Sequence, residues 1–549
     1  MGKVTAFFLS PFSFHHILLS LCKPESLMPY QNRRSSYLSF ILIFVFIKIG
    51  LNLLAMSHFG FHRDEFLHLV LADHLDWGYK EVPPFIALLA KISTTLFGYS
   101  VFAARIFPTI CGGLVVWLTG LITIEFGGRR FAIALACLAL IFAPAFAASD
   151  YLFQPVVFDQ LWWLLAVWLL VKYCNTSNAK YLYWLGAVVG IGLLTKYTMA
   201  FFTFSLLAGI AISKQRKMLL NRHILGAVIV AILIFLPNVI WQFQHGLPVI
   251  RHMKTLQENQ LDYNKPSDFI MQELMVNGIA IFVWLTGFIF LLFSFRLHKF
   301  QFVAIAFILI FTFLLVMNGK SYYLFGAYPM LFAAGGFGFE RWLKTSGYTL
   351  RSLVIALFTV PNLILFPVVL PFLSLNQTVS YIDFLHKKTS GLNFITTWED
   401  HKQHPLTQDY ADMLGWDEMT EKVAKAWQSL TAEQRKHAQI FADNYGEAGA
   451  IHLLGKPYHL PEVISLASSF ALWAPDNLNG QYIIYVDDKG GGNVDSFKDQ
   501  LESYRKVGEV NNPLAREKGT AIFLLVRPKP GLNQRYRNDL AQRRVGLKI

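Results

Sequence analysis

The sequence predicts a polytopic α-helical membrane protein of about eleven spans, followed by a C-terminal α/β domain outside the bilayer. Three observations support this fold class. Of the 549 residues, 54% are hydrophobic and only 15% are charged, which is too apolar for an ordinary soluble protein. Runs of roughly 20 mostly apolar residues, the length that crosses a bilayer, recur along the chain. The composition then turns polar after residue 374.

The predicted spans divide the chain into three parts. These are an N-terminal cytoplasmic extension (1 to 35), a transmembrane domain (36 to 374) and an extracytoplasmic α/β domain (375 to 549). The stretch at 181 to 194 is short for a span, so the count is open by one or two. The eleven segments lie near residues 36 to 56, 102 to 125, 131 to 148, 155 to 172, 181 to 194, 198 to 213, 223 to 241, 277 to 295, 301 to 317, 322 to 340 and 351 to 374.

The first 28 residues lack the pattern of a signal peptide. Their apolar stretch is broken by Pro11 and the pair His15 and His16, and no small-residue cleavage site follows. We expect a non-structural extension, with Met28 as an alternative start to Met1. The four cysteines have no CxxC spacing, so neither a disulfide framework nor a zinc site is implied.

The basic residues predict the orientation in the membrane. Lys and Arg accumulate in short cytoplasmic loops, and with the N-terminus inside nearly every cytoplasmic turn is basic. This bias explains the net charge of +13 without nucleic acid as a partner. The cations assigned to that side are Arg33, Arg34, Arg129, Arg130, Lys172, Lys180, Lys214, Arg216, Lys217, Arg222, Arg296, Lys299, Arg341, Lys344 and Arg351.

This orientation places two long loops (57 to 101 and 242 to 276) and the C-terminal part outside. Alternating or apolar runs at 439 to 443, 481 to 486 and 521 to 526 predict short strands between helices. The basic tail from Arg527 to Lys548 is expected to be poorly ordered. Gly490 to Gly492 follow a strand without phosphate-loop spacing, which favours a turn.

An acidic pair follows the first span. Asp64 and Glu65 would lie at the interface, where carboxyl pKa values can rise toward neutrality, as suits a general base. A merely solvated acidic loop is the alternative. His58, His62 and His74 leave metal ligation open, although no metal site is assigned.

Charged residues also mark the outer ends of later spans. Asp159 lies one turn inside an apolar segment, and Asp150 lies just outside it. A charged residue within a span is costly and therefore suggests a functional site. The alternative is that the side chain snorkels to the membrane surface. Arg105, Lys196 and Lys320 stand on the side that cations avoid, where they would suit an anionic ligand such as a phosphate. Tyr322 and Tyr323 follow Lys320 and neighbour this site.

Two groups of glycines predict close helix packing. Gly186 and Gly190 have GxxxG spacing, and Gly335, Gly336 and Gly338 cluster similarly.

The ordered set of motifs resembles a known family. The acidic pair, Pro83-Pro84, Arg105, Phe158-Asp159-Gln-Leu-Trp-Trp163, Leu193-Leu-Thr-Lys196-Tyr197 and Lys320-Ser-Tyr-Tyr323 with Tyr328-Pro329 resemble bacterial glycosyltransferase family 39 proteins. These are relatives of the dolichyl-phosphate-mannose protein mannosyltransferases and the lipid A aminoarabinose transferase. The resemblance covers residues 36 to 374, and 443 to 448 with 468 to 475 resembles the outer domain of one bacterial branch.

The resemblance implies a GT-C fold and sugar transfer from a polyprenyl-phosphate carrier to an acceptor hydroxyl of lipid A, another glycan or a protein, outside the inner (plasma) membrane. Asp64 would be the general base or orient the acceptor, with Glu65 beside it and Asp159, or alternatively Asp150, as the second acid. Lys196, Lys320 and Arg105 would hold the departing phosphate. One base and direct displacement predict inversion. The absence of a DxD motif argues against a nucleotide-sugar donor. No cofactor is assigned, and a divalent cation is left open.

Two other functions compete with this one. A multispanning transporter or lipid flippase would also bury charges in a helix bundle, although here the polar residues gather at outer ends. In a third interpretation, the outer domain is a binding module on a membrane scaffold. The sequence names neither the sugar nor the acceptor.

Overall fold

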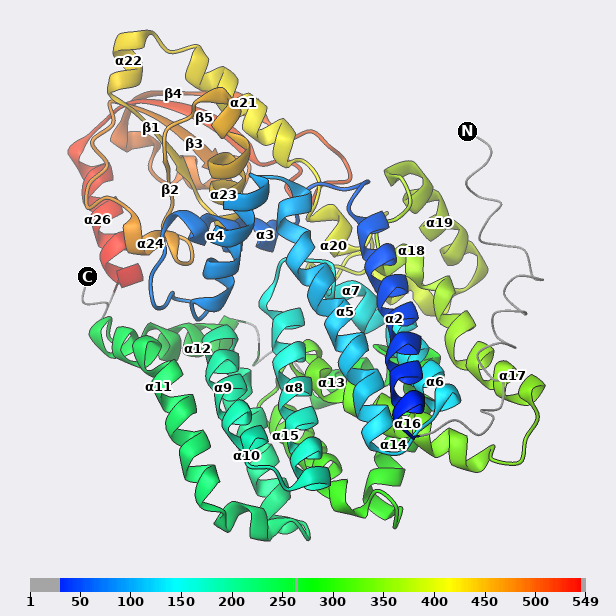
Figure 1. Cartoon of the computed structure of the whole chain (residues 1–549). Helices are drawn as coiled ribbons and strands as arrows, with labels where there is room; N and C mark the ends of the chain where they lie inside the picture. Colours follow the sequence, from blue (N-terminus) through cyan, green and yellow to red (C-terminus); the bar gives the residue numbers. More distant parts are fainter. Residues whose placement is uncertain (1–29, 260, 262–264, 545–549) are drawn as a thin grey trace.

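The computed structural model describes residues 30–259, 261 and 265–544 as a bundle of apolar helices that carries an α/β domain on one end (Figure 1). The extension predicted for residues 1 to 28, and with it the choice between Met1 and Met28, lies outside the described residues.

Each of the eleven predicted segments contains a helix of the bundle. Among the residues that the structure describes, five helices are long and apolar enough to cross a membrane, and a pair bent by 95° (Pro266–Met275 with Gly278–Phe293) would add a sixth. Five further apolar helices are shorter, so the count of eleven spans stays a prediction. The bundle helices are α2 (Tyr30–Ala55), α5 (Val101–Glu125), α6 (Arg130–Phe142), α8 (Pro155–Thr176), α9 (Lys180–Thr195), α10 (Thr198–Ile212), α11 (Arg222–Gln244), α14 (Ile281–Phe293), α15 (Gln301–Val316), α16 (Tyr328–Trp342) and α17 (Tyr348–Thr359).

The glycine positions confirm the predicted close helix contacts. A Cβ atom on Gly186 of α9 would lie 2.2 Å from the carbonyl oxygen of Ala227 in α11. One on Gly335 of α16 would lie 2.0 Å from the carbonyl oxygen of Val283 in α14. Because nothing larger than hydrogen fits at either position, these residues let the backbones approach.

The first long outer loop folds onto the end of the bundle. It contains α3 (Arg63–Val70), η1 (Leu71–Asp73) and α4 (Phe85–Phe97), and the second long loop contains α12 (Pro248–Asn259) and α13 (Pro266–Met275). The bend between the short helix α7 (Pro144–Ser149) and α8 lies next to α3, where the backbone N–H of Phe153 donates to Glu65.

The C-terminal domain is built on a five-stranded sheet in the order β2-β1-β3-β5-β4. Strands β1 (Ala438–Ala442), β2 (Val463–Ile464) and β3 (Tyr482–Asp487) are parallel, while β5 (Ala521–Pro528) runs antiparallel to β3 and β4 (Leu501–Glu509). The longer helices around it are α21 (Trp416–Gln428), α23 (Tyr445–Leu454) and α26 (Pro530–Arg544), whereas α19 (Leu375–Lys388) packs next to α18 (Phe366–Val369), away from the sheet (Figure 1). The prediction of strands at β1, β3 and β5 is confirmed.

The prediction of a poorly ordered basic tail is wrong for the residues described up to Arg544. Residues 530–544 form α26, in which Leu532, Tyr536 and Leu540 are buried against the sheet. Arg544 also donates to the carbonyl oxygen of Ala471 at 2.8 Å. The apolar residues recur every four positions, so one face of an otherwise polar helix finds a partner in the domain.

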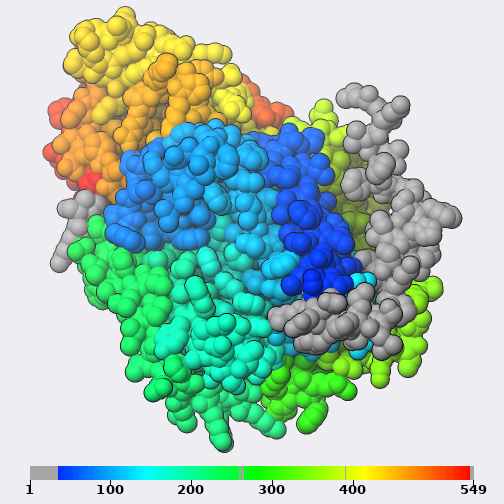
Figure 2. Space-filling view, in the orientation of Figure 1, coloured from blue at the N-terminus to red at the C-terminus, as the bar shows by residue number. Residues whose placement is uncertain are grey.

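The outer domain rests on the first outer loop, as the yellow-to-red and blue surfaces in Figure 2 show. His452 of α23 pairs with Asp73 at 2.9 Å, and the N–H of Lys80 donates to Ser469 at 3.1 Å. Loops predicted to be cytoplasmic meet at the far end of the bundle, where Lys299 donates to Asn175. The structure therefore separates the basic turns from the outer domain, as the charge pattern predicts.

Candidate functional site

The first turn of α3 places an acidic pair beneath the outer domain. His62 is the N-cap: its Nδ1 accepts from the N–H of Asp64 at 3.2 Å, and its own N–H donates to Glu65 Oε2 at 2.8 Å. This capping box satisfies two N–H groups at the helix start and fixes where both acids point. The two carboxylates differ in exposure: Glu65 is buried, whereas Asp64 is half-buried.

Glu65 is held in a buried ion pair with Arg105. Its carboxylate is fully buried and receives Arg105 Nε at 3.1 Å and a second Arg105 nitrogen at 2.9 Å. Burial raises the pKa of Glu65. The charge of Arg105 and the hydrogen bonds from Arg105, His62 and Phe153 outweigh this effect and hold the pKa below the ordinary value. Arg105 has no exposed surface. Arg105 is thus paired with Glu65 while its Nη1 has no hydrogen-bond partner, so the roles of Arg105 in holding a phosphate and of Glu65 in the chemistry stay predictions.

Asp64 is the acid that remains available. Gln154 donates to Oδ2 at 3.0 Å, and the Tyr445 hydroxyl donates to Oδ1 at 2.8 Å. Burial raises the pKa of Asp64, yet His62, His68 and the Tyr445 hydrogen bond together lower it below the ordinary value. The expectation of a pKa near neutrality is therefore wrong for Asp64, which stays a carboxylate able to accept a proton.

Lys320 lies near Asp64, and Lys196, from a distant part of the chain, lies near Lys320. Lys320 precedes η6 (Ser321–Ala327), and its ammonium interacts electrostatically with the carboxylates of Glu399 and Asp64. Lys196 ends α9, and its ammonium lies 4.7 Å from the ring centroid of Tyr323 and 4.9 Å from that of Tyr322. Aromatic faces stabilise an ammonium group without neutralising it.

Lys320 is close enough to Lys196 for its charge to affect the pKa of Lys196. Burial lowers the pKa of Lys196 to about 8; the charge of Asp159 opposes this shift and that of Lys320 adds to it. Neither lysine forms an ion pair with a carboxylate within the described part of the chain. Both cations therefore remain able to bind an anion.

The two candidate second acids are now distinguished. Asp159 of α8 is buried; Oδ2 accepts from Thr198 at 2.6 Å, Oδ1 has no hydrogen-bond partner, and its charge acts on Lys196. Asp150 instead pairs with Lys48 of α2 at 3.1 Å, and both side chains are almost fully buried. Asp159 thus lies near Lys196, whereas Asp150 connects the bend before α8 to α2.

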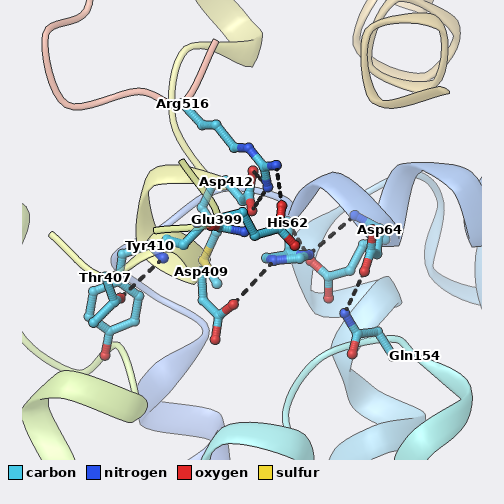
Figure 3. Close-up of polar contacts among 12 residues, drawn as sticks. His62, Asp64, Gln154, Glu399, Thr407, Asp409, Tyr410, Asp412 and Arg516 are labelled. Carbon is cyan, nitrogen blue, oxygen red and sulfur yellow. Dashed lines mark hydrogen bonds and ion pairs between the residues drawn. The ribbon is translucent and has the colours of Figure 1, made fainter. Parts of the chain in front are cut away.

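Residues of the outer domain form a polar cluster next to His62 at the start of α3 (Figure 3). Arg516 pairs with Asp412 at 3.0 Å and with Glu399 at 2.7 Å. Burial raises the pKa of Asp412 to about 6, although His62, Arg516 and Arg63 oppose the shift. His62 Nε2 lies 4.0 Å from Asp409 and makes no hydrogen bond. The cluster joins residues 399 to 412 and 516 to the start of α3.

The histidines of the first loop do not gather into a metal site. His58 contacts Ser57, His62 caps α3, and His74 stacks on Trp473 with ring centroids 4.0 Å apart. Among the described residues, the group with metal-ligand geometry is Asp443, Asp487 and Asp488 in the outer domain.

Sequence reasoning missed the residues that position Asp64. Gln154 precedes the Pro155 at which α8 begins, and Tyr445 follows the N-cap Asn444 of α23. Tyr445 lies inside a stretch that carried the resemblance, but nothing in the sequence connected it to residue 64 across 381 positions.

Comparisons with known proteins agree with this architecture. Residues 81–241 match the family described as dolichyl-phosphate-mannose-protein mannosyltransferase; this segment contains Asp159 and Lys196 but neither Asp64 nor Lys320. No curated protein sequence matches the chain.

Two solved structures share the fold. ArnT from Cupriavidus metallidurans in the apo state is 14% identical, covers 89% of this chain and 98% of its own, and superposes with a TM-score of 0.57. The same protein bound to undecaprenyl phosphate is 14% identical over 90% of this chain and 98% of its own, with a TM-score of 0.55. The chain therefore shares the ArnT fold over most of its length, and part of it matches the mannosyltransferase family that the sequence resemblance names.

Proposed function

We propose that this protein transfers a sugar from a polyprenyl-phosphate carrier to an acceptor hydroxyl at the membrane face that carries the outer domain. The observation that supports this most strongly is the convergence of Asp64, Lys320 and Lys196, from three distant parts of the chain, with Asp159 beside Lys196. A site that combines one free carboxylate with two unpaired cations suits the transfer of a group away from a phosphate.

In the proposed reaction, Asp64 accepts the proton of the acceptor hydroxyl as its oxygen bonds to the anomeric carbon. The bond between that carbon and the phosphate oxygen breaks, and the polyprenyl phosphate leaves with the electron pair. Lys196 and Lys320 hold the negative charge that develops on the leaving phosphate, which is usually a large part of catalysis. A single displacement inverts the anomeric carbon.

The donor class follows from the position of the lysines. Lys196 follows the last residue of α9, and Lys320 lies between α15 and η6, where the phosphate of a lipid carrier would reside while its chain stays in the bilayer. The ArnT structure with undecaprenyl phosphate supports a carrier of this kind. The acceptor would be a lipid, a glycan or a protein reached from outside the inner membrane; sugar and acceptor are not distinguished by these residues.

The test is a transfer assay with purified chain, radiolabelled polyprenyl-phosphate sugars and a membrane extract as the acceptor source. Wild type should label an acceptor and Asp64→Asn should lose 10² to 10⁴-fold, the usual range for a general base. Asp383→Asn, an exposed acid on α19, is the matched control and should stay active. The proposal fails if Asp64→Asn transfers normally. Carrier movement across vesicles without transfer would favour the transporter alternative.

A further inference from the structure

The end of the bundle opposite the outer domain contains a cavity that the proposed transfer does not use. It has a volume of about 810 Å³ and lies between the turn after α5, the turn after α14 and the last turn of α16. Helix α16 packs against both α5 and α14, so the three ends meet at the side of the basic turns (Figure 1). Its lining combines arginines with phenylalanines.

Two arginines line this cavity without a partner. Arg296 follows α14 and is exposed, whereas Arg341 lies in the last turn of α16 and is half-buried. Neither guanidinium group makes a hydrogen bond or an ion pair with another residue that the structure describes. Arg341 instead lies over Phe337, with its guanidinium carbon 5.2 Å from the ring centroid. The charges of Arg296 and Arg129 act on Arg341, so positive charge is concentrated at one cavity and an anion would relieve the repulsion.

One acid acts on these arginines without neutralising them. Glu340 precedes Arg341, and its charge acts on that guanidinium group. Its Oε2, however, accepts from the backbone N–H of Arg129 at the start of α6 at 3.0 Å, and the charges of Arg351 and Arg129 also act on it. A single carboxylate therefore stands among four arginines, and the surroundings of the cavity remain positive.

The rest of the lining is mostly aromatic and continues into an exposed apolar surface. Phe126 and Phe337 are buried, and the half-buried ring of Phe290 meets that of Phe337 edge-on at 6.4 Å. Phe295 also lines the cavity, yet it is 93% exposed, and Phe293 beside it is 80% exposed. Exposed phenylalanines next to a basic cavity suit a ligand that has both an anionic group and an apolar part, and a free phosphate has only the first.

We propose that this cavity binds the headgroup of an anionic phospholipid from the membrane that the bundle is predicted to cross. Arg296 and Arg341 bind its phosphate, since guanidinium groups donate paired hydrogen bonds to phosphate oxygens. Phe295 packs against the acyl chains where they leave the headgroup. Basic pockets between membrane helices bind such headgroups, and the positive charge of a zwitterionic headgroup would be repelled by the two arginines. The site lies apart from Asp64, Lys196 and Lys320, so it does not depend on the proposed transfer.

The binding test uses the full chain in detergent, depleted of lipid and titrated with phosphatidylglycerol or phosphatidylcholine in native mass spectrometry. Wild type should bind phosphatidylglycerol more tightly than phosphatidylcholine, and the variant with Arg296→Gln and Arg341→Gln should bind phosphatidylglycerol roughly tenfold more weakly or worse. The matched control, with Arg216→Gln and Arg222→Gln, loses two exposed arginines from another basic turn and should bind as wild type does. The proposal is overturned if the cavity variant binds normally, if the control loses as much affinity, or if inorganic phosphate displaces the lipid.

Thermal unfolding separates lipid binding from a purely structural role of the two arginines. Phosphatidylglycerol should raise the Tm of wild type and of the control variant more than that of the cavity variant. Without lipid, the cavity variant should melt at the wild-type Tm or above it, because two repelling charges are gone, which also shows that it folds. Arginines can also neutralise the partial negative charge at helix ends. A Tm that is lowered equally with and without phosphatidylglycerol would assign them that role and contradict the lipid site.

Discussion

The Tyr445 hydroxyl donates a hydrogen bond of 2.8 Å to Asp64 Oδ1 and so connects the outer domain to the start of α3. Tyr445 sits on the first turn of α23, and the guanidinium carbon of Arg63 lies 4.8 Å from its ring centroid. The outer domain is therefore not only a neighbour of the candidate site, because one of its side chains orients the proposed base.

Removal of this hydrogen bond should slow transfer without unfolding the protein. Hydrogen bonds to charged groups contribute about 1.5–3 kcal/mol, so Tyr445→Phe should lower kcat/KM by roughly 10- to 100-fold. The matched control is Tyr504→Phe, an exposed tyrosine on β4. Steady-state kinetics with labelled donor provide the measurement. A Tyr445→Phe variant as active as Tyr504→Phe would show that the contact does not position the base.

The acidic side of the pH–activity profile should reflect the lowered pKa of Asp64. Because the pKa of Asp64 is lowered, the carboxylate stays ionised as the pH falls, and loss of activity from its protonation begins only below about 3.9, the pKa of a free aspartate. Tyr445→Phe removes one of the groups that lower this pKa, so its activity should decline at a higher pH. A wild-type decline already centred near pH 6 would contradict Asp64 as an ionised base.

The alkaline side should reflect Lys196. Burial lowers its pKa to about 8, so the ammonium loses its charge as the pH rises through that value, and the KM for the donor should rise there. Lys196→Arg keeps the cation at all accessible pH values and should remove this rise. Lys254→Arg, an exposed lysine on α12, is the control and should behave as wild type does. An unchanged alkaline KM profile in Lys196→Arg would exclude Lys196 as its origin.

Arg105 should matter for stability rather than for donor binding. Loss of one partner from a buried ion pair costs about 3–5 kcal/mol, so Arg105→Met should lower the Tm markedly. In the double variant with Glu65→Met the loss should be smaller than the sum of the single losses. Arg251→Met, on the exposed face of α12, should leave the Tm unchanged. A normal Tm with a raised donor KM in Arg105→Met would restore the phosphate role to Arg105.

Most helices of the bundle could be predicted because hydrophobicity is a local property. The apolar strands β1, β3 and β5 follow from the same signal. Strand β4 was missed since Leu501–Glu509 is an edge strand with mostly exposed, charged residues, which resembles a loop. Helix α26 was missed because its composition is polar, although Leu532, Tyr536 and Leu540 recur at the helical spacing of four.

The site was only partly predictable. Sequence position and charge bias place Asp64, Lys196 and Lys320 on one side of the membrane, and the structure brings them together. The folded chain decides which charges form ion pairs. Glu65 pairs with Arg105, and Asp150 pairs with Lys48. Such pairs leave no mark on local composition, so the sequence could not separate structural charges from available ones.

The proposed roles of Asp64 as the base and Lys320 as a ligand of the leaving phosphate are tested most directly by the kinetics of transfer from a labelled polyprenyl-phosphate sugar. Asp64→Asn should lower kcat by 10² to 10⁴-fold with little change in donor KM, whereas Lys320→Ala should raise donor KM as well as lower kcat. Lys254→Ala should match wild type. If Asp64→Asn and Lys320→Ala both retain wild-type kcat and KM, the proposed site does not carry out the transfer.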